Sequence, residues 1–246
     1  MMTVRKVESI AELLTNLAAD NASYQGAIWF RGHADLSWSL IPGYYRISSP
    51  PSEGTLLKRF KQSAAMLIDR QPGDTFDWLF LMQHYGVPTR LLDWTESPLV
   101  ALYFAVSDQA YETHDGALWL LKPTELNKDA GIHGSEEFFI PSFEDDELKN
   151  YSVEILAHNP RQKLNPIATI ATRNNPRIQS QLGVFTIHHS DACAIEGVGD
   201  KDHINKYKIP HSAKSALKEE LRLLGYNKFQ LFPELASIGD IIKEGL

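Results

Sequence analysis

The residue that most limits how this chain can fold is Arg31, which lies inside an apolar, strand-like stretch beginning at Ala27. The run Trp29, Phe30, Arg31, Gly32 would place a guanidinium beside a hydrophobic core. Arginine stays charged at physiological pH and carries five N–H donors in a planar fork, so burying it unpaired is costly. The strand must therefore bring Arg31 to a bound anion or to a core carboxylate, and these residues leave both options open. Gly32 would let the backbone turn or approach a ligand closely.

Four segments of the chain resemble the FRG domain family. The run Trp-Phe-Arg-Gly-His-Ala-Asp at residues 29–35, continuing to residue 42, is similar to the opening block of the family. Residues 84–105 resemble its central signature, residues 177–186 its third block and residues 231–235 its closing one. The resemblance covers most of the chain, and it implies the family more strongly than a function, since the family is defined by sequence.

The order of the polar blocks is also similar to that of ADP-ribosyltransferases with an Arg/Ser/Glu arrangement. Such enzymes use an arginine on an early strand, a Ser/Thr turn that enters a helix, and a late Glu-x-Glu before another strand. Arg31 would match the first, the turn at residues 93–95 the second, and Gln179 with Gln181 the third. The resemblance implies an ADP-ribosyltransferase-like α+β fold that binds NAD or a related nucleotide. The reaction would transfer ADP-ribose to a nucleic-acid or protein acceptor, or hydrolyse NAD, and bacterial or phage defence is the implied setting.

This analogy assigns a role to each polar block. Cleavage of the nicotinamide–ribose bond passes through an oxocarbenium-like state, so the phosphates and the ribose must be held while positive charge develops. The expected catalytic residues are Arg31, Asp93 and Gln181. The expected cofactor-binding residues are Arg31, Gly32, His33, Tyr85, Thr89, Arg90, Trp94, Thr95 and Gln179.

One position departs from the enzyme pattern. Gln181 stands where a glutamate is expected, and a carboxamide can bind a ribose hydroxyl but cannot act as a base or offset positive charge. Asp93 or Glu96 could supply the missing carboxylate, or His33 or His84 could act as the base. The alternative for Asp93 is a structural role, either capping a helix or pairing with an arginine.

Charge argues against a broad nucleic-acid surface, because the 246-residue chain has a formal net charge of -7. A local exception lies between Glu154 and Asp191, where no acidic residue occurs. The cations of that segment are Arg161, Lys163, Arg173 and Arg177, accompanied by His158, His188 and His189. A second hypothesis is therefore a non-catalytic module that binds nucleic acid or another anionic partner. The alternative is a solvated surface neutralised by its neighbours.

Other features predict a cytoplasmic protein without a metal site or a membrane segment. Cys193 is the only cysteine, which excludes an internal disulfide, and its alanine neighbours suggest a small buried hydrophobe. The first twenty residues lack the apolar core of a secretory signal, and the apolar run at residues 98–106 is too short to span a bilayer. The acidic run at residues 136–147 fits no calcium loop, and the histidines show no zinc-ligand spacing.

Apolar spacing and capping residues predict a mixture of helices and strands. Helices are expected at residues 7–17, 56–70, 75–85, from Pro98 onward, at 213–224 and from Pro233 onward, with strands at 27–32, 117–121, 184–187 and 207–209. Strict strand–helix alternation is missing, so the prediction is a single α+β domain with a mixed or antiparallel central sheet flanked by helices. Its expected parts are an N-terminal helix within residues 1–25 and an FRG domain at 26–246 with an acidic insertion at 127–150. The aromatic residues expected in the core are Trp29, Trp38, Trp78, Phe104 and Trp119.

Overall fold

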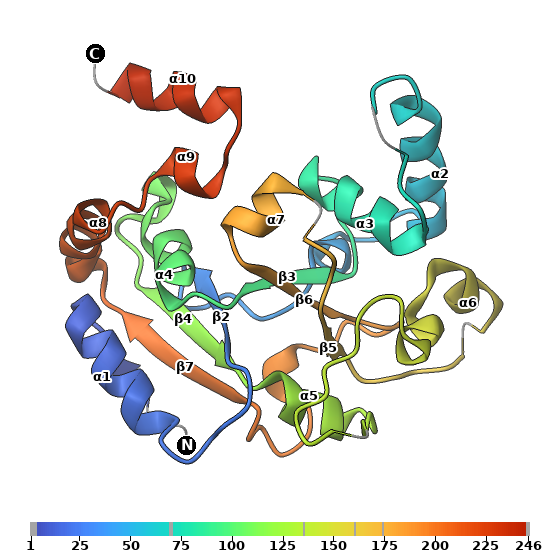
Figure 1. Cartoon of the computed structure of the whole chain (residues 1–246), viewed down its shortest axis with the longest axis horizontal. Coiled ribbons are helices and arrows are strands. Elements are labelled where there is room, and N and C mark those ends of the chain that lie inside the picture. Colours follow the sequence, from blue (N-terminus) through green and yellow to red (C-terminus); the bar gives the residue numbers. More distant parts are fainter. Residues whose placement is uncertain (1–3, 69–70, 135, 160, 174, 245–246) are drawn as a thin grey trace.

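The computed structural model describes residues 4–68, 71–134, 136–159, 161–173 and 175–244. The strands are β1 (Arg5–Lys6), β2 (Trp29–His33), β3 (Leu91–Thr95), β4 (Gly116–Leu121), β5 (Ile167–Thr169), β6 (Gly183–Ile187) and β7 (Ile204–Ile209). They form one seven-stranded sheet in the order β1-β7-β4-β2-β3-β6-β5 (Figure 1). The β1–β7 pair is parallel and the other neighbouring pairs are antiparallel. The predicted single α+β domain with a mixed sheet is confirmed.

Helices flank this sheet. The α-helices are α1 (Ile10–Asp20), α2 (Glu53–Ala64), α3 (Thr75–His84), α4 (Pro98–Val106), α5 (Pro123–Asp129), α6 (Val153–His158), α7 (Pro176–Ser180), α8 (Lys214–Leu223), α9 (Lys228–Leu231) and α10 (Leu235–Glu244). Short 3-10 helices are η1 (Gly43–Arg46), η2 (Gln109–Tyr111), η3 (Asp146–Tyr151), η4 (Ile195–Gly197) and η5 (His211–Ala213). Among the described residues, no helix has the length and apolar character needed to cross a bilayer.

Capping residues explain where the helices around the site begin and end. The Ser97 hydroxyl accepts a hydrogen bond from the backbone N–H of Val100 and starts α4, with Pro98 in its first turn. Gly86 follows α3 with a φ of +76°, as a residue beyond a helix end often does. The α2 helix starts earlier than predicted because Ser52 caps it, and it ends at Ala64. The last two residues of the predicted helix lie outside the described residues.

The segment at residues 93–95 corrects the sequence prediction. It was expected as a turn entering a helix, but Asp93, Trp94 and Thr95 belong to β3. All five residues of this strand pair with β6, and alternate side chains on it are buried against different faces of the sheet. The bulky apolar residues Leu91, Leu92 and Trp94 favour this strand, and the helix signal from Ser97 starts only after it.

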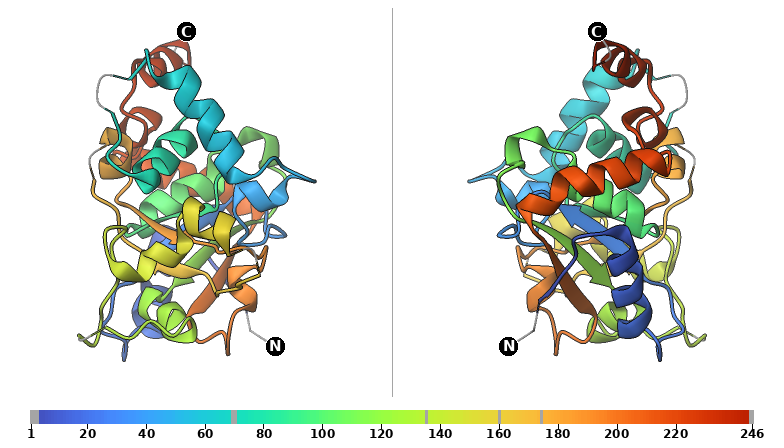
Figure 2. Two further views of the ribbon diagram at one scale, coloured as in Figure 1. Left: turned by 90° about the vertical axis from the view of Figure 1, so that its right-hand side faces the viewer. Right: turned by 90° about the vertical axis from the view of Figure 1, so that its left-hand side faces the viewer.

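Three apolar clusters fill the two faces of the sheet. On one face, α1, α4 and α8 cover β2, β4 and β7, and α2 and α3 cover β3, β6 and β5. Figure 2 shows α1 and α8 on the same side of the molecule. The third cluster covers the opposite face with α5 and the loops around Leu40 and Ile195. The first two clusters therefore meet near the boundary between β2 and β3.

The predicted aromatic core is correct in part. Trp29, Trp78 and Trp119 are buried, whereas Trp38 and Phe104 are half-buried. Cys193 is half-buried and packs against the cluster around Leu40. In the acidic segment at residues 127–150, Phe143 packs against Phe76 and Phe80 of α3 and Leu148 is buried, so this part of the chain is anchored to the core.

Candidate functional site

The sheet opens between β2 and β3. These strands share a single residue pair, Phe30 with Thr95. By contrast, β2 has five pairs with β4, and β3 has five with β6. A cavity of about 1060 Å³ lies at this opening, with walls from β2, β3, β6, α3, α4 and α7 to α10. Separated strands leave backbone groups without ladder partners, so the gap is a place where side chains or a ligand must supply hydrogen bonds.

Arg31 lines this cavity and spans the gap. One guanidinium NH group donates to the backbone carbonyl oxygen of Asp93, and Nε donates to Nε2 of His33 over 3.1 Å. Among the described residues, no carboxylate forms an ion pair with Arg31. Burial lowers the pKa of Arg31 to about 10, with Asp93 acting in the opposite direction, so the guanidinium is charged at neutral pH. The arginine thus replaces part of the missing strand pairing and keeps further N–H donors at the cavity.

Asp93 belongs to the same cavity but leaves the sheet on the other face from Arg31. Phe30 lies opposite Thr95, and side chains alternate along each strand, so Asp93 shares the face of Phe30 and Thr95. Its carboxylate oxygen Oδ1 accepts a hydrogen bond from Nε2 of Gln83 over 2.6 Å. Asp93 is solvent-exposed, and Gln83 also lines the cavity. The site therefore has a guanidinium and a carboxylate on opposite sides of one gap.

Gln181 lies on the cavity wall as the residue that ends α7. Its side-chain Nε2 donates to the backbone oxygen of Leu231 over 3.0 Å, and its backbone oxygen accepts from the Thr95 hydroxyl over 2.7 Å. The Thr95 hydroxyl also accepts from the backbone N–H of Ser97. Thr95 thus connects β3 to the end of α7, and its hydroxyl is occupied by protein partners.

Aromatic and cationic side chains line the cavity from α3, α4, α7 and the residue after α9. The guanidinium of Arg177 lies 4.6 Å from the centre of the Phe232 ring, and Phe232 makes an edge contact with Phe104. His84 lines the same wall, 3.8 Å from a carboxylate oxygen of Glu234. Burial and the positive charge of Arg177 lower the pKa of His84, against the effect of Glu234. Flat rings and cations close together suit an anionic ligand that carries an aromatic group.

Several residues expected to bind a cofactor lie away from the cavity. Tyr85 is 66% exposed and packs beside Phe60 and His84. Gln179 is exposed on α7, and Thr89 is buried. These three side chains do not line the cavity, whereas Trp94 and Thr95 do. Trp94 is nevertheless buried and donates from Nε1 to the Thr186 hydroxyl, so it belongs mainly to the core.

His33 is also buried behind the cavity wall. Trp119 Nε1 lies 3.2 Å from its Nδ1, and Arg31 approaches its Nε2. Burial, with Arg31 and Arg46 acting in the same direction, lowers the pKa of His33 to about 2. A ring with so low a pKa is a weak base at neutral pH, so this geometry favours orientation of Arg31 over proton transfer.

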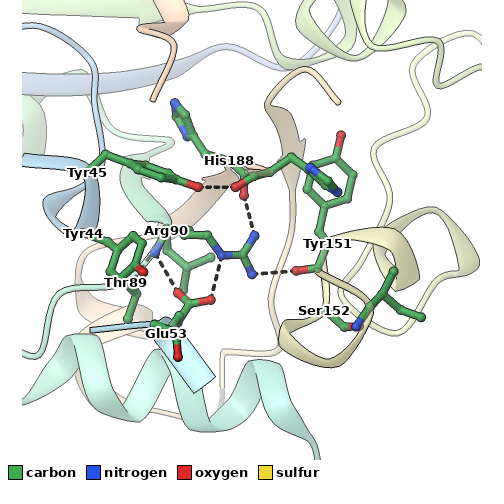
Figure 3. A network of polar contacts seen from close by, with 12 residues as sticks. Tyr44, Tyr45, Glu53, Thr89, Arg90, Tyr151, Ser152 and His188 are labelled. Atoms are coloured by element: carbon green, nitrogen blue, oxygen red, sulfur yellow. Dashed lines mark hydrogen bonds and ion pairs between the residues drawn. The ribbon is translucent and has the colours of Figure 1, made fainter. Parts of the chain in front are cut away.

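Arg90 is held by a closed structural network (Figure 3). Its Nε donates to a Glu53 carboxylate oxygen over 2.6 Å, and its two terminal nitrogens donate to the backbone oxygens of His188 and Tyr151. Its backbone N–H also donates to Glu53. Arg90 is 1% exposed. These contacts join α2, η3 and the end of β6 to the start of β3, and they keep the guanidinium away from the cavity.

Gly32 has a structural role that the sequence reading did not predict. A Cβ atom at this position would lie 1.8 Å from the backbone oxygen of Ala101 and 2.7 Å from the backbone nitrogen of Ala105. Glycine is therefore required for the close packing of β2 against α4. Of the two alternatives expected for Gly32, a turn is wrong, because the residue lies within a regular strand, and a close approach to a ligand stays a prediction.

The positive segment at residues 155–190 does not form one continuous patch in the described structure. Lys163 pairs with Asp191, Arg173 pairs with Glu96, and Arg177 lies on the cavity wall. His188 and His189 are buried. Only part of the positive charge of this segment is therefore available on the surface to an anionic partner. Nucleic-acid binding by the segment stays a prediction.

Residues 26–114 match the FRG domain. The chain carries an FRG domain. No similar curated protein and no similar solved structure was found. The resemblance noted in the sequence is thereby confirmed for this region, whereas the more distant resemblance to ADP-ribosyltransferases stays a prediction.

The FRG domain match supplies one side of the cavity. Arg31, Gln83 and Asp93 lie within residues 26–114, whereas Arg177, Gln181 and the residues of α8 to α10 lie beyond them. Sequence reasoning identified Arg31, Asp93 and Gln181 as a group, and the structure brings all three to one cavity. It missed Gln83, Arg177 and Phe232 as parts of the wall. Arg177 and Phe232 fall inside the family-like blocks at 177–186 and 231–235. Their place in these blocks is the sequence feature that could have identified them as site residues.

Proposed function

We propose that this chain is an ADP-ribosyltransferase-like domain that binds NAD or a related nucleotide in the cavity between β2 and β3. The observation that carries the proposal is Arg31. Its guanidinium is charged, half-buried and on the cavity wall, with a backbone oxygen and an imidazole as its hydrogen-bond partners. Such a group favours an anionic ligand, and a phosphate matches its planar fork of donors.

The size and composition of the cavity support a nucleotide over a smaller anion. Its volume of about 1060 Å³ is at the upper end of the range for small-molecule sites. Phe80, Phe104 and Phe232 offer apolar surface, and Arg177 offers a second cation. A ligand with a base, a sugar and phosphates can use all of these groups at once.

The proposed chemistry follows from the charged groups. Arg31 would hold a phosphate while the nicotinamide–ribose bond breaks. The carboxylate of Asp93 would oppose the positive charge that develops on the ribose, a task that the Gln181 carboxamide cannot perform. Gln181 uses its Nε2 for Leu231, which leaves its side-chain oxygen to accept from a ribose hydroxyl. The acceptor of ADP-ribose would be water, a protein or a nucleic acid.

Thermal melting with and without NAD tests the binding step. A ligand at 100 times its Kd stabilises the folded state by about 2.7 kcal/mol, so NAD should raise the melting temperature of the wild type. Arg31→Ala should abolish this shift, and Arg31→Lys should weaken it, because lysine lacks the bidentate fork. Arg222→Ala is the matched control, since Arg222 is an exposed arginine of α8 that does not line the cavity. An unchanged melting curve at millimolar NAD would remove the nucleotide proposal.

A further inference from the structure

Three hydrogen bonds form a directed chain that ends at the cavity wall, at Gln83 and Asp93. The backbone N–H of Leu91 donates to the Thr89 hydroxyl oxygen over 3.2 Å. The Thr89 hydroxyl donates to Oε1 of Gln83, and Nε2 of Gln83 donates to Oδ1 of Asp93 over 2.6 Å. The chain runs from the backbone at the start of β3 to the carboxylate in the middle of the same strand, by way of α3.

The Asp93 carboxylate at the end of this chain fixes the orientation of the Gln83 amide. The Thr89 hydroxyl accepts from Leu91, and it has only one proton to donate. The carboxylate of Asp93 can only accept, so the NH₂ group of Gln83 must face it, and Oε1 of Gln83 is left to accept the Thr89 proton. The flipped amide would place two acceptor oxygens 2.6 Å apart, one of them on a carboxylate. The carboxylate thus sets the orientation of the Gln83 amide, and the Thr89 hydroxyl, on a residue that is 2% exposed, anchors the amide oxygen on its other side.

We infer that Gln83 is a positioning residue that holds the Asp93 carboxylate in place for the reaction in this cavity, and that Thr89 keeps Gln83 in the required orientation. The inference rests on the proposed function, because it assigns the reactive carboxylate to Asp93 on β3. Asp93 is exposed, and an exposed aspartate without such a partner samples several rotamers. Gln83 binds one oxygen, Oδ1, which leaves the second oxygen to oppose charge on the substrate.

A merely structural role for Gln83 is the competing explanation, since its side chain also ties α3 to β3. The two explanations differ in what they predict for kinetics. A structural tie affects stability and NAD affinity, whereas a positioning residue affects the step in which the bond breaks. The suitable reaction is cleavage of NAD by water, which breaks the ribose–nicotinamide C–N bond and yields ADP-ribose, nicotinamide and a proton.

The kinetic test compares two pairs of variants of the full chain. Gln83→Leu should lower kcat for NAD cleavage by about 10- to 100-fold with KM changed less than about 3-fold, because a displacement of about 1 Å can cost on the order of 100-fold. Thr89→Val removes the hydroxyl and should lower kcat in the same way, whereas Thr89→Ser retains it and should restore most of the rate. Gln62→Leu, on the exposed side of α2, is the control for loss of a glutamine.

A second readout does not depend on turnover. In a ¹⁵N–¹H NMR spectrum the side-chain amide pair of Gln83 is identified by its loss in Gln83→Leu. Asp93→Asn and Thr89→Val should both shift this pair, and Thr89→Ser should leave it close to its wild-type position. If the chemical shifts of this amide pair are unchanged in Asp93→Asn, the inference is overturned. This outcome counts even where a variant folds too poorly for kinetics.

The outcomes separate the two proposals. Wild-type cleavage of NAD with an unaltered kcat in Gln83→Leu would overturn the positioning role and leave the proposed function standing. A raised KM with unchanged kcat would also overturn it, since Gln83 would then act in binding. A wild type that neither binds nor cleaves NAD would overturn the proposed function itself.

Discussion

Arg31 and Arg90 show how differently one residue type is used within a single sheet. Arg90 is enclosed by Glu53 and two backbone oxygens, so its charge is balanced inside the protein. Arg31 has a backbone oxygen and a histidine ring as partners and lines a cavity. A charge balanced internally is part of the fold, because removing either partner leaves a buried charge uncompensated, whereas a charge at a cavity is available to a ligand.

Removal of one partner of the Arg90 network should be strongly destabilising. In Arg90→Met the Glu53 carboxylate, 6% exposed, would stay buried without its counter-charge. The expected loss is about 3–5 kcal/mol of unfolding free energy, measured by urea denaturation. The double variant Arg90→Met with Glu53→Leu should recover part of that loss. A loss below about 1 kcal/mol in the single variant would contradict this account of the network.

Two buried histidines should make the protein less stable in mild acid. Burial is the main cause that lowers the pKa of His33 to about 2 and that of His188 to about 4. The unfolded chain takes up protons below its histidine pKa of about 6.5, while the native rings stay neutral, so stability falls as pH falls through 6.5. Each ring should lower the unfolding free energy by about 2 kcal/mol at pH 5, relative to its value above the histidine pKa of the unfolded chain. His188→Gln should reduce the slope of unfolding free energy against pH, and an unchanged slope would show that this ring is not responsible.

At the scale of elements, the feature that creates the site is the separation of β2 from β3. Arg31 crosses the gap to the backbone oxygen of Asp93, and α4 packs closely on β2 at Gly32. On the other side, Thr95 ties β3 to the end of α7. The gap between β2 and β3 is thus fixed on one side by the packing of β2 on α4 and on the other by the contact between β3 and α7.

Gly32→Ala should disturb this packing. The added Cβ would lie 1.8 Å from the Ala101 backbone oxygen, so β2 and α4 must move apart. Overpacking of this kind typically costs about 1–3 kcal/mol, and a backbone obstacle places the variant at the upper end of that range. Gly197→Ala is the matched control, since no heavy atom lies within 4 Å of its added Cβ. Equal melting temperatures for the two variants would contradict the close approach of β2 and α4.

At the scale of the whole molecule, the cavity is completed by segments far apart in the chain. The FRG domain match ends at residue 114, before β4 begins at Gly116. Of the strands in the described structure, the matched region holds β2 and β3, which share one residue pair. Their main partners, β4 and β6, lie outside the match.

A fragment of residues 26–114 should therefore not fold by itself. Two strands joined by a single pair cannot bury the apolar faces of α2, α3 and α4. The amide region of its NMR spectrum should be poorly dispersed, whereas the full chain under the same conditions should give a dispersed spectrum. A dispersed spectrum of the fragment, with a cooperative melting transition, would show that the matched region is an independent folding unit.

The sequence by itself determined the α+β class, most helices near the site and the group Arg31, Asp93 and Gln181. Local signals sufficed for the elements, because caps, glycines after helices and apolar periodicity act within a few residues. The sequence also placed Asp93 wrongly on a turn and could not separate Arg90, a structural arginine, from Arg31.

Only the tertiary structure decided those questions. Whether an arginine meets a buried carboxylate or a cavity depends on segments that are distant in sequence, such as Glu53 for Arg90. The gap between β2 and β3 arises from strand pairing, which no local pattern encodes. The position of Gln83 against Asp93 follows from the docking of α3 on the sheet, so its role became visible only once the strands and helices were assembled.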